Sequence, residues 1–265
     1  MKRLRFGEKI LRIRDEPEPT PVNGKTPILF IHGAGMSSVV FMDLLRPIAP
    51  SRRVIALDLP GHGQSDPWHT PSLAMYADVV GTVCAHLGLK KIIVAGHSMG
   101  GLVALHCARS FPERIAGLVL ISSAARLSVP KELFLSLERE LPAAETALVE
   151  SMPTCLRDLS FSASTPKDLV QKWQGLLFQT TRQVLLQDLV LCADVDLSDT
   201  LHKLDLPSLI IGGQDDLLVS PSRILATHKA IRSSQLELFP YAGHFPHLER
   251  SEDFVKILRG FLSSL

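Results

Sequence analysis

The sequence predicts an α/β fold in which a mostly parallel, doubly wound sheet carries helices on both faces. Short, continuous apolar runs recur along the chain, which is typical of strands buried on both faces of a parallel sheet. Segments with helical periodicity lie between these runs. One long stretch, residues 124–201, shows no convincing strand, and it predicts a helical insertion between two strands of the sheet.

The first elements expected are two short alternating segments, 4–6 and 10–13, which predict an antiparallel edge pair with a turn at Gly7. A proline-rich connection at 15–27 follows and cannot join the interior of a sheet. Apolar runs then predict the strands of the main sheet, at residues 27–33, 52–63, 90–98, 115–123, 207–216 and 234–244.

Helices are expected between these strands. Residues 72–89 place Leu73, Tyr76 and Val80 on one face. Residues 98–112 end at a proline, which cannot continue a helix. The last segment, 251–265, begins with Ser251 as the expected N-cap and has acidic residues in its first turn.

The insertion divides the chain into two predicted units. Residues 1–123 and 202–265 form the core, and residues 124–201 form a helical cap. Within the cap, 131–152 and 166–195 have amphipathic helical patterns. Breaks are expected at Pro130, Pro142, Pro153 and Pro166. Such insertions often cover the mouth of a pocket, although a packing extension without a gating role would have the same pattern.

Composition excludes several classes of function. The net charge is +1 over 265 residues and no basic stripe is present, so a nucleic-acid partner is not expected. No apolar run approaches the roughly 18 residues of a membrane span. The N-terminus lacks the apolar region of a signal peptide, and the four cysteines lack metal-binding spacing. We therefore expect a cytoplasmic protein with reduced cysteines.

The motif GHSMG, residues 96–100, marks the candidate active site. It matches G-x-S-x-G with an apolar strand before it and a helix after it, which is the context in which this motif carries a nucleophile. A sharp strand-to-helix turn would lift Ser98 into a cleft, and small residues such as Gly96 and Gly100 are needed where the turn crowds its neighbours. The start of the helix also favours negative charge that develops near Ser98.

A serine nucleophile needs a base, and the base needs an acid that orients it. Asp215 and Asp216 follow a predicted strand, and His244 follows the last predicted strand. The order serine, acid, histidine is the one that accompanies this motif. All three positions fall at the carboxyl ends of strands, where doubly wound sheets bind ligands. The residues alone leave Asp215 and Asp216 as alternatives.

Two other histidines, His97 and His247, are weaker candidates for the base. His247 lies in the same loop as His244, and we interpret it as a surface residue or one that supports the site from behind. His97 precedes the nucleophile and cannot easily reach the hydroxyl of its neighbour, so we interpret it as a packing residue or a pocket wall. A metal site formed by His244, His247 and the aspartates is a weak alternative, because HExxH is absent; no metal and no organic cofactor are expected.

Attack by serine creates an oxyanion that needs two fixed N–H donors. One should be the backbone N–H of Met99, directly after the nucleophile. The other should come from the loop HGAG, residues 32–35, which predicts the N–H of Ala34.

With LFIHGAG, ALDLPGHGQSD, VAGHSMGGLVAL, GGQDDLLVSP and AGHFPHLE, the sequence resembles the α/β-hydrolase superfamily over nearly its whole length. The resemblance implies an α/β-hydrolase fold with a helical cap, and it favours Asp216 over Asp215 because the acid follows a G-x-x-D-x-x-x-P-like stretch. Here the proline comes one residue late, at Pro221. Ser98 departs from superfamily members that use an aspartate nucleophile, such as haloalkane dehalogenases and epoxide hydrolases.

The resemblance leads to an expected function. Ser98, His244 and Asp216 would cleave a carboxylic ester, or a related thioester or lactone, through an acyl-enzyme. The cap's Leu, Phe, Val and Met content favours a small, apolar acyl substrate, although these residues would equally pack the cap onto the core. Two alternatives remain. One is a carbon–carbon bond hydrolase or a lyase/synthase with the same triad; the other is a small-ligand receptor with slow or no turnover.

An acyl carrier protein is a possible partner that the sequence does not favour. Pimeloyl-carrier-protein methyl ester esterases of this superfamily bind their carrier through basic lid residues. The basic residues of the predicted cap are accompanied by many acidic ones; they are Lys131, Arg139, Arg157, Lys167, Lys172 and Arg182. The sequence predicts no oligomeric state.

Overall fold

The computed structural model describes residues 1–16, 24–68, 71–141, 143–178 and 180–265. Most of the proline-rich connection and the predicted break at Pro142 lie outside these residues.

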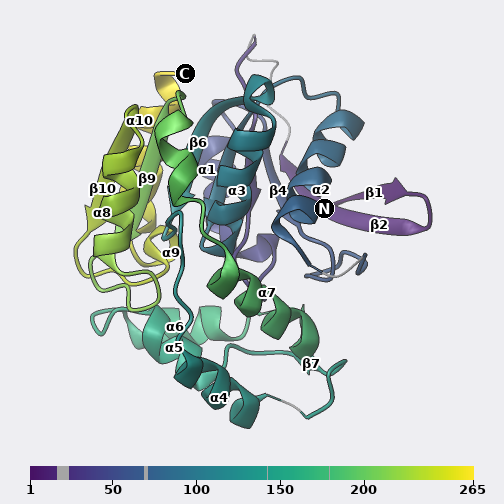
Figure 1. Cartoon of the computed structure of the whole chain (residues 1–265), viewed down its shortest axis with the longest axis vertical. Helices are drawn as coiled ribbons and strands as arrows, with labels where there is room; N and C mark the ends of the chain where they lie inside the picture. Colours follow the sequence, from purple (N-terminus) through teal and green to yellow (C-terminus); the bar gives the residue numbers. More distant parts are fainter. Residues whose placement is uncertain (17–23, 69–70, 142, 179) are drawn as a thin grey trace.

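Within the described residues, eight strands form one sheet in the order β1-β2-β4-β3-β5-β6-β9-β10 (Figure 1). The pairs β1–β2 and β2–β4 are antiparallel, and the remaining neighbours are parallel. The strands are β1 (Lys2–Phe6), β2 (Lys9–Glu16), β3 (Ile28–Ile31), β4 (Val54–Asp58), β5 (Ile92–His97), β6 (Ile115–Ile121), β9 (Ser208–Gly213) and β10 (Ser234–Phe239).

Burial explains the two kinds of strand pattern in the sequence. Every residue of β3, β4, β5 and β9 is buried, because these strands have neighbours on both sides and are covered on both faces. The edge pair β1 and β2 instead alternates between exposed and buried residues. The predicted α/β fold with a mostly parallel sheet is confirmed, including the antiparallel edge pair.

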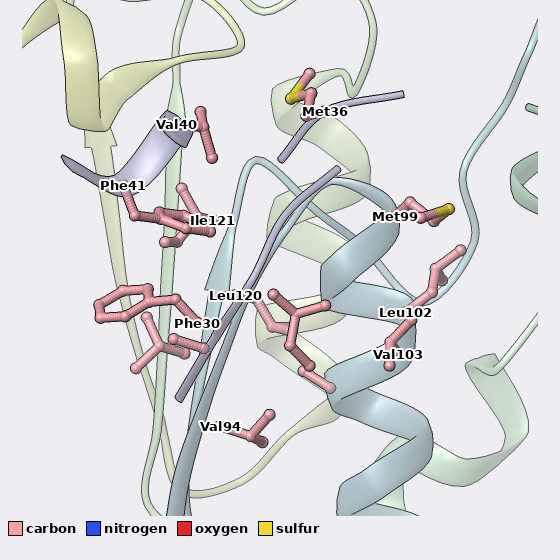
Figure 2. Close-up of a cluster of buried hydrophobic side chains, with 14 of the residues drawn as sticks. Phe30, Met36, Val40, Phe41, Val94, Met99, Leu102, Val103, Leu120 and Ile121 are labelled. Atoms are coloured by element: carbon pink, nitrogen blue, oxygen red, sulfur yellow. The ribbon is translucent and has the colours of Figure 1, made fainter. Parts of the chain in front are cut away.

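Helices cover both faces of the sheet. On one face α2 (Leu73–His86) packs against α3 (Met99–Ser110), and on the other face α1 (Met42–Ile48) packs against α10 (Ser251–Ser263). Figure 2 shows Met99, Leu102 and Val103 projecting from α3, with Phe30 and Phe41 on the other side of the strands. The ring centroids of Phe30 and Phe41 lie 4.9 Å apart. These rings on one side and the side chains of α3 on the other give the sheet an apolar layer on each face.

The last helix of the core, α10, begins one residue earlier than the sequence predicts. The predicted N-cap at Ser251 is wrong by one residue, because Ser251 is the first helical residue and Arg250 occupies the cap position without a side-chain cap. The other helices are α8 (Pro221–Ala230), α9 (Pro246–Glu249) and three 3₁₀ segments, Ser38–Phe41, Pro112–Arg114 and Ser198–Lys203.

The segment between β6 and β9, residues 124–201, is called the insertion below. Its helices gather at one end of the molecule in Figure 1, in teal and green. They are α4 (Lys131–Glu140), α5 (Thr154–Ser160), α6 (Lys167–Gln174) and α7 (Arg182–Asp194). The expectation of no strand here is wrong for a small ribbon, β7 (Leu148–Val149) with β8 (Thr180–Thr181). Two residues are too few for a strand periodicity to appear in the sequence.

None of the helices in the described ranges is both long enough and apolar enough to cross a lipid bilayer.

Candidate active site

Ser98 lies on a strained turn between β5 and α3. Its φ is 53° and its ψ is −120°, a conformation that a residue with a side chain rarely adopts. The glycines of GHSMG allow this turn, because a Cβ on Gly96 would lie 2.0 Å from the carbonyl oxygen of Gly100, and one on Gly100 would lie 2.2 Å from that of Ile31. The crowding that the motif predicted is therefore present in the structure.

Two hydrogen bonds fix the backbone of Ser98. Its N–H donates to the carbonyl oxygen of Ile121 at 2.9 Å, and its own carbonyl accepts from Ser123 Oγ at 2.8 Å. Ser98 is partly exposed, whereas its neighbours His97 and Met99 are fully buried. The turn thus leaves the serine as the accessible residue of this segment.

His244 and Asp216 form a buried pair. His244 Nδ1 lies 2.8 Å from Asp216 Oδ2, and the other carboxylate oxygen accepts from the backbone N–H groups of Leu218 at 2.9 Å and Val219 at 2.8 Å. Because the carboxylate can only accept, the shared proton is assigned to Nδ1, and Nε2 keeps a lone pair that can take up a proton.

Asp215 points elsewhere. It is exposed, and its Oδ2 accepts from Ser162 Oγ at 2.5 Å. The structure therefore brings Asp216, and not Asp215, to His244.

The backbone of His244 is held from two sides. Its N–H donates to the carbonyl of Ser160 in the insertion at 2.5 Å, and its carbonyl accepts from His97 Nε2 at 2.9 Å. Burial, followed by the nearby His244 and His247, lowers the pKa of His97 well below its ordinary value. His97 is thus a neutral imidazole that packs behind the site and orients the His244 loop.

The surface interpretation of His247 is wrong. His247 is fully buried between the rings of Phe41, His97 and Phe254. Burial, and to a smaller extent His244, lowers its pKa to about 3. The HFPHLE segment gives no sequence signal for this, because the burial depends on tertiary packing against Phe41 of the 3₁₀ segment before α1, His97 of β5 and Phe254 of α10.

The loop 32–35 approaches Ser98 directly. A Cβ on Gly33 would lie 3.1 Å from Ser98 Cβ, and Ala34 lines the same cavity as Ser98. Met99 is the first residue of α3, so its N–H precedes the intrahelical hydrogen-bond ladder. One predicted oxyanion donor thus directly follows Ser98 at the start of α3, and the other lies in the loop that lines the same cavity as Ser98.

A cavity of about 50 Å³ connects these groups. Ser98, His244 and Ala34 line it together with apolar side chains, most of them from the insertion. Among the described residues that line it, none is Lys, Arg, Asp or Glu. The cavity therefore suits a small, neutral and apolar group next to Ser98.

This arrangement can perform nucleophilic acyl chemistry. It combines an accessible hydroxyl, an imidazole oriented by a buried carboxylate, and backbone N–H groups beside the hydroxyl. In the part of the chain that the structure describes, no group of three or more His, Cys, Asp or Glu residues could hold a metal ion.

Two carboxylates beside the site, the half-buried Glu249 and the fully buried Asp188, were not identified from the sequence. Glu249 Oε1 accepts from the N–H groups of Gly243 at 3.0 Å and Phe245 at 3.2 Å, on either side of His244. Its Oε2 accepts from Ser162 N–H at 3.0 Å and from the hydroxyl of Thr165, both in the insertion. Glu249 therefore fastens the His244 loop to the insertion.

The second is Asp188 on α7, which is fully buried. The sequence does carry a signal for it: Leu185, Leu189 and Cys192 occupy the buried face of α7, and Asp188 is the one acid at that spacing on that face. A lone carboxylate on an apolar helix face needs buried partners.

Comparisons with known proteins point to one family. A family described as "alpha/beta hydrolase fold" matches residues 26–251. The pimeloyl-[acyl-carrier protein] methyl ester esterase of Vibrio campbellii is 30% identical over 241 residues, covering 88% of this chain and 93% of its own. The enzyme of the same name from Stenotrophomonas maltophilia (strain K279a) is 31% identical over 255 residues, covering 92% and 96%.

Among solved structures, a thermophilic esterase from Thermogutta terrifontis is similar over the whole chain. Its TM-score is 0.84 at 26% sequence identity, and the match covers 100% of this chain and 99% of the esterase.

Proposed function

The chain belongs to the α/β-hydrolase family, and from this premise we propose that it is a serine hydrolase that cleaves a carboxylic ester through an acyl-enzyme intermediate. One observation carries the proposal. His244 shares a cavity wall with Ser98 and has its other ring nitrogen 2.8 Å from the buried Asp216. The esterase names of the similar proteins support the choice of an ester.

In the first half of the reaction, His244 Nε2 removes the proton of Ser98 Oγ as the oxygen attacks the carbonyl carbon of the ester. Asp216 keeps the imidazole in the required tautomer and stabilises its positive charge. The carbonyl oxygen becomes an oxyanion that accepts from the N–H groups of Ala34 and Met99. His244 then donates its proton to the departing alkoxide, which leaves as an alcohol, and the acyl group stays on Ser98.

The second half repeats these roles with water. His244 removes a proton from a water molecule, whose oxygen attacks the acyl carbon, and the same N–H groups bind the second oxyanion. When this intermediate collapses, His244 returns the proton to Ser98 Oγ. The products are a carboxylic acid and the free enzyme, and no metal or organic cofactor takes part in any step.

The substrate class follows from the cavity wall. We assign residues 124–201 as a cap over the core formed by 1–123 and 202–265, because Leu133, Met152 and Leu189 of the insertion line the cavity next to Ser98. Such a wall favours a short, neutral acyl group, since burying a charge there without a partner would be costly. Thioesters and lactones present the same acyl carbon and fit the same chemistry.

A carrier-bound methyl ester is the second candidate, and the names of the two curated relatives are what favour it. Several cations of the insertion already pair with carboxylates. Arg157 lies 2.7 Å from Asp158, and Lys172 lies 3.3 Å from Asp43. Pairs of this kind weaken a surface for an acidic carrier protein, so we place a free small-molecule ester first.

The test is a panel of p-nitrophenyl acyl esters, thioesters, lactones and free and carrier-bound methyl esters, assayed with wild type, Ser98→Ala and Ser128→Ala. We expect Ser98→Ala to lower kcat by roughly four to six orders of magnitude. Ser128 lines the same cavity but takes no part in the proposed acyl chemistry, so its variant should keep kcat within about threefold of wild type, with any larger change confined to KM.

Three outcomes would contradict the proposal. Ser98→Ala could hydrolyse the esters as fast as wild type. Wild type could cleave a vinylogous diketone and leave simple esters untouched, which would favour a carbon–carbon bond hydrolase. It could also give a single-turnover burst without steady turnover, which would favour a receptor.

A further inference from the structure

The carboxylate of Asp188 connects the insertion to three parts of the core. Its Oδ2 accepts from the backbone N–H of Gly35 at 3.0 Å and lies 2.7 Å from His62 Nε2. Its Oδ1 accepts from Tyr76 Oη at 2.8 Å. Gly35 belongs to the loop of the proposed oxyanion donor, His62 to the loop after β4, and Tyr76 to α2. Figure 1 shows α7 where the insertion meets the core.

His62 is held so that it donates to Asp188. Its Nδ1 lies 3.0 Å from the carbonyl oxygen of Pro60, and its Nε2 faces the Asp188 carboxylate, so both ring nitrogens face acceptors and both carry protons. Burial alone would lower the pKa of His62, but the charge of Asp188 and the hydrogen bonds to Asp188 and Pro60 raise it above the ordinary value. Asp188 and His62 therefore form a buried ion pair.

Residues of the core fix the peptide bond between Gly33 and Ala34. The carbonyl oxygen of Gly33 accepts from His32 Nδ1 at 2.9 Å and from Met36 N–H at 3.2 Å. His32 Nε2 accepts from Leu59 N–H at 3.0 Å, so the proton of this ring is on Nδ1. In a trans peptide the N–H points opposite to the carbonyl, and these bonds therefore direct the Ala34 N–H away from them.

The peptide after Ala34 is fixed by the insertion. The N–H of the Ala34–Gly35 peptide bond is that of Gly35, and it donates to Asp188. The side chains of Leu185 and Phe178 pack closely against the same glycine. A Cβ on Gly35 would lie 2.6 Å from Leu185 Cδ1, and Gly35 has a φ of +68°. Leu185 and Asp188 are three residues apart, so one face of α7 makes both contacts.

We propose that Asp188 is a positioning residue for the oxyanion donor Ala34, and that His62 and Tyr76 hold Asp188 in place for this purpose. Ala34 lies between two fixed peptide planes, one set by the core and the other by α7. The insertion is then a structural part of the oxyanion hole as well as a cavity wall. This inference rests on the proposed ester hydrolysis through Ser98.

The test compares Asp188→Asn and Tyr76→Phe with Asp194→Asn, the same substitution at an exposed position of α7. Active sites are titrated with a fluorophosphonate, so that kcat is expressed per reactive Ser98. The second readout is the Ki of a trifluoromethyl ketone, whose adduct with serine places an oxyanion between the donors.

We expect Asp188→Asn to lower kcat by about 10- to 100-fold with KM within about threefold, because outright removal of one oxyanion donor costs about 100- to 1,000-fold and displacement costs less. The Ki of the ketone should rise by the same factor. Tyr76→Phe removes one hydrogen bond to Asp188 and should give a smaller change in both quantities, in the same direction. Asp194→Asn should leave both unchanged.

A purely structural role would lower the melting temperature and the fraction of titratable sites while kcat per site and Ki stayed at wild-type values. That result, in Asp188→Asn or, if this variant does not fold, in Tyr76→Phe, would overturn the inference. Failure of the proposed function is distinguishable, because Ser98→Ala would then retain activity whatever the Asp188 variant does.

Discussion

The core and the insertion reach the cavity in different ways. At the carboxyl edge of the sheet, Ser98, Asp216 and His244 lie on short loops whose backbone groups are hydrogen-bonded. The insertion instead contributes mainly apolar side chains from helices, such as Leu133 and Leu189. Chemistry thus depends on backbone geometry in the core, whereas the space for the acyl group depends on side-chain volume in the insertion.

Substitutions in the core and in the insertion should therefore have different consequences. A change in a core loop should reduce the rate for every substrate alike. A change in the wall of the insertion should alter which substrate is preferred. Asp188 is one exception, because it lies in the insertion and contacts the core loop of Ala34 by way of Gly35.

The largest effect is expected in the core. Asp216→Asn should lower kcat by about ten-thousand-fold for all ester chain lengths, because the asparagine would favour the wrong tautomer of His244. Asp215→Asn is the matched control, since Asp215 is adjacent, exposed and bonded to Ser162. Steady-state kinetics on a series of p-nitrophenyl esters would measure both variants. A larger loss in Asp215→Asn than in Asp216→Asn would contradict the assignment of the acid.

An intermediate effect is expected in the insertion. Leu133→Ala should enlarge the cavity and raise kcat/KM for esters one to three methylenes longer by roughly tenfold, since each methylene in an apolar pocket contributes about 1–3 kcal/mol. The free energy of unfolding should fall by about 2–5 kcal/mol. Leu135, on the same helix but exposed, is the control. An unchanged chain-length profile in Leu133→Ala would show that this wall does not bind the acyl group.

The smallest effect concerns stability at the contact between the two regions. The pKa of His62 is raised above its ordinary 6.5 in the folded state, so the folded protein binds this proton more tightly than the unfolded chain does. The resulting stabilisation is complete below about pH 6.5 and is lost as the pH rises through the raised pKa.

We therefore expect the melting temperature of wild type to fall between pH 6.5 and 8.5, and to fall less steeply in His62→Gln. His247, whose pKa is lowered to about 3, acts on the opposite side and costs stability as the pH falls below 6.5. Calorimetry over pH 5 to 8.5 would separate the two slopes. Equal alkaline slopes in wild type and His62→Gln would contradict the buried ion pair.

Much of the core could be predicted because its signals are local. A buried parallel strand is a continuous apolar run, and GHSMG contains the glycines that the turn at Ser98 needs. The approach of Asp216 to His244 was predicted as well, although choosing it over Asp215 required the resemblance to a family. The roles of these residues in catalysis stay predictions until the variants are measured.

What could not be predicted depends on long-range packing. The burial of His247 comes from Phe41 and Phe254, which are far from it in the sequence or on another helix. The contact of Asp188 with Gly35 joins residues 153 positions apart. Glu249 likewise contacts Thr165, 84 positions away. The contacts of Asp188 and Glu249 are set by how the insertion folds back onto the core, and the burial of His247 by packing within the core; no local pattern in the chain encodes either.

Cys192 lines the cavity and lies one turn beyond Asp188 on α7. Its thiol can therefore be used as a chemical probe of the position of α7. Burial, and then the charge of Asp188, raises the pKa of its thiol, so the sulfur is protonated and shielded while α7 is seated. A maleimide can react only if α7 moves away from the core, because that movement exposes the sulfur and removes the burial that is the main cause of the raised pKa. The alkylation rate of Cys192 would therefore report any displacement of α7 from the core, with no substrate and no catalytic turnover.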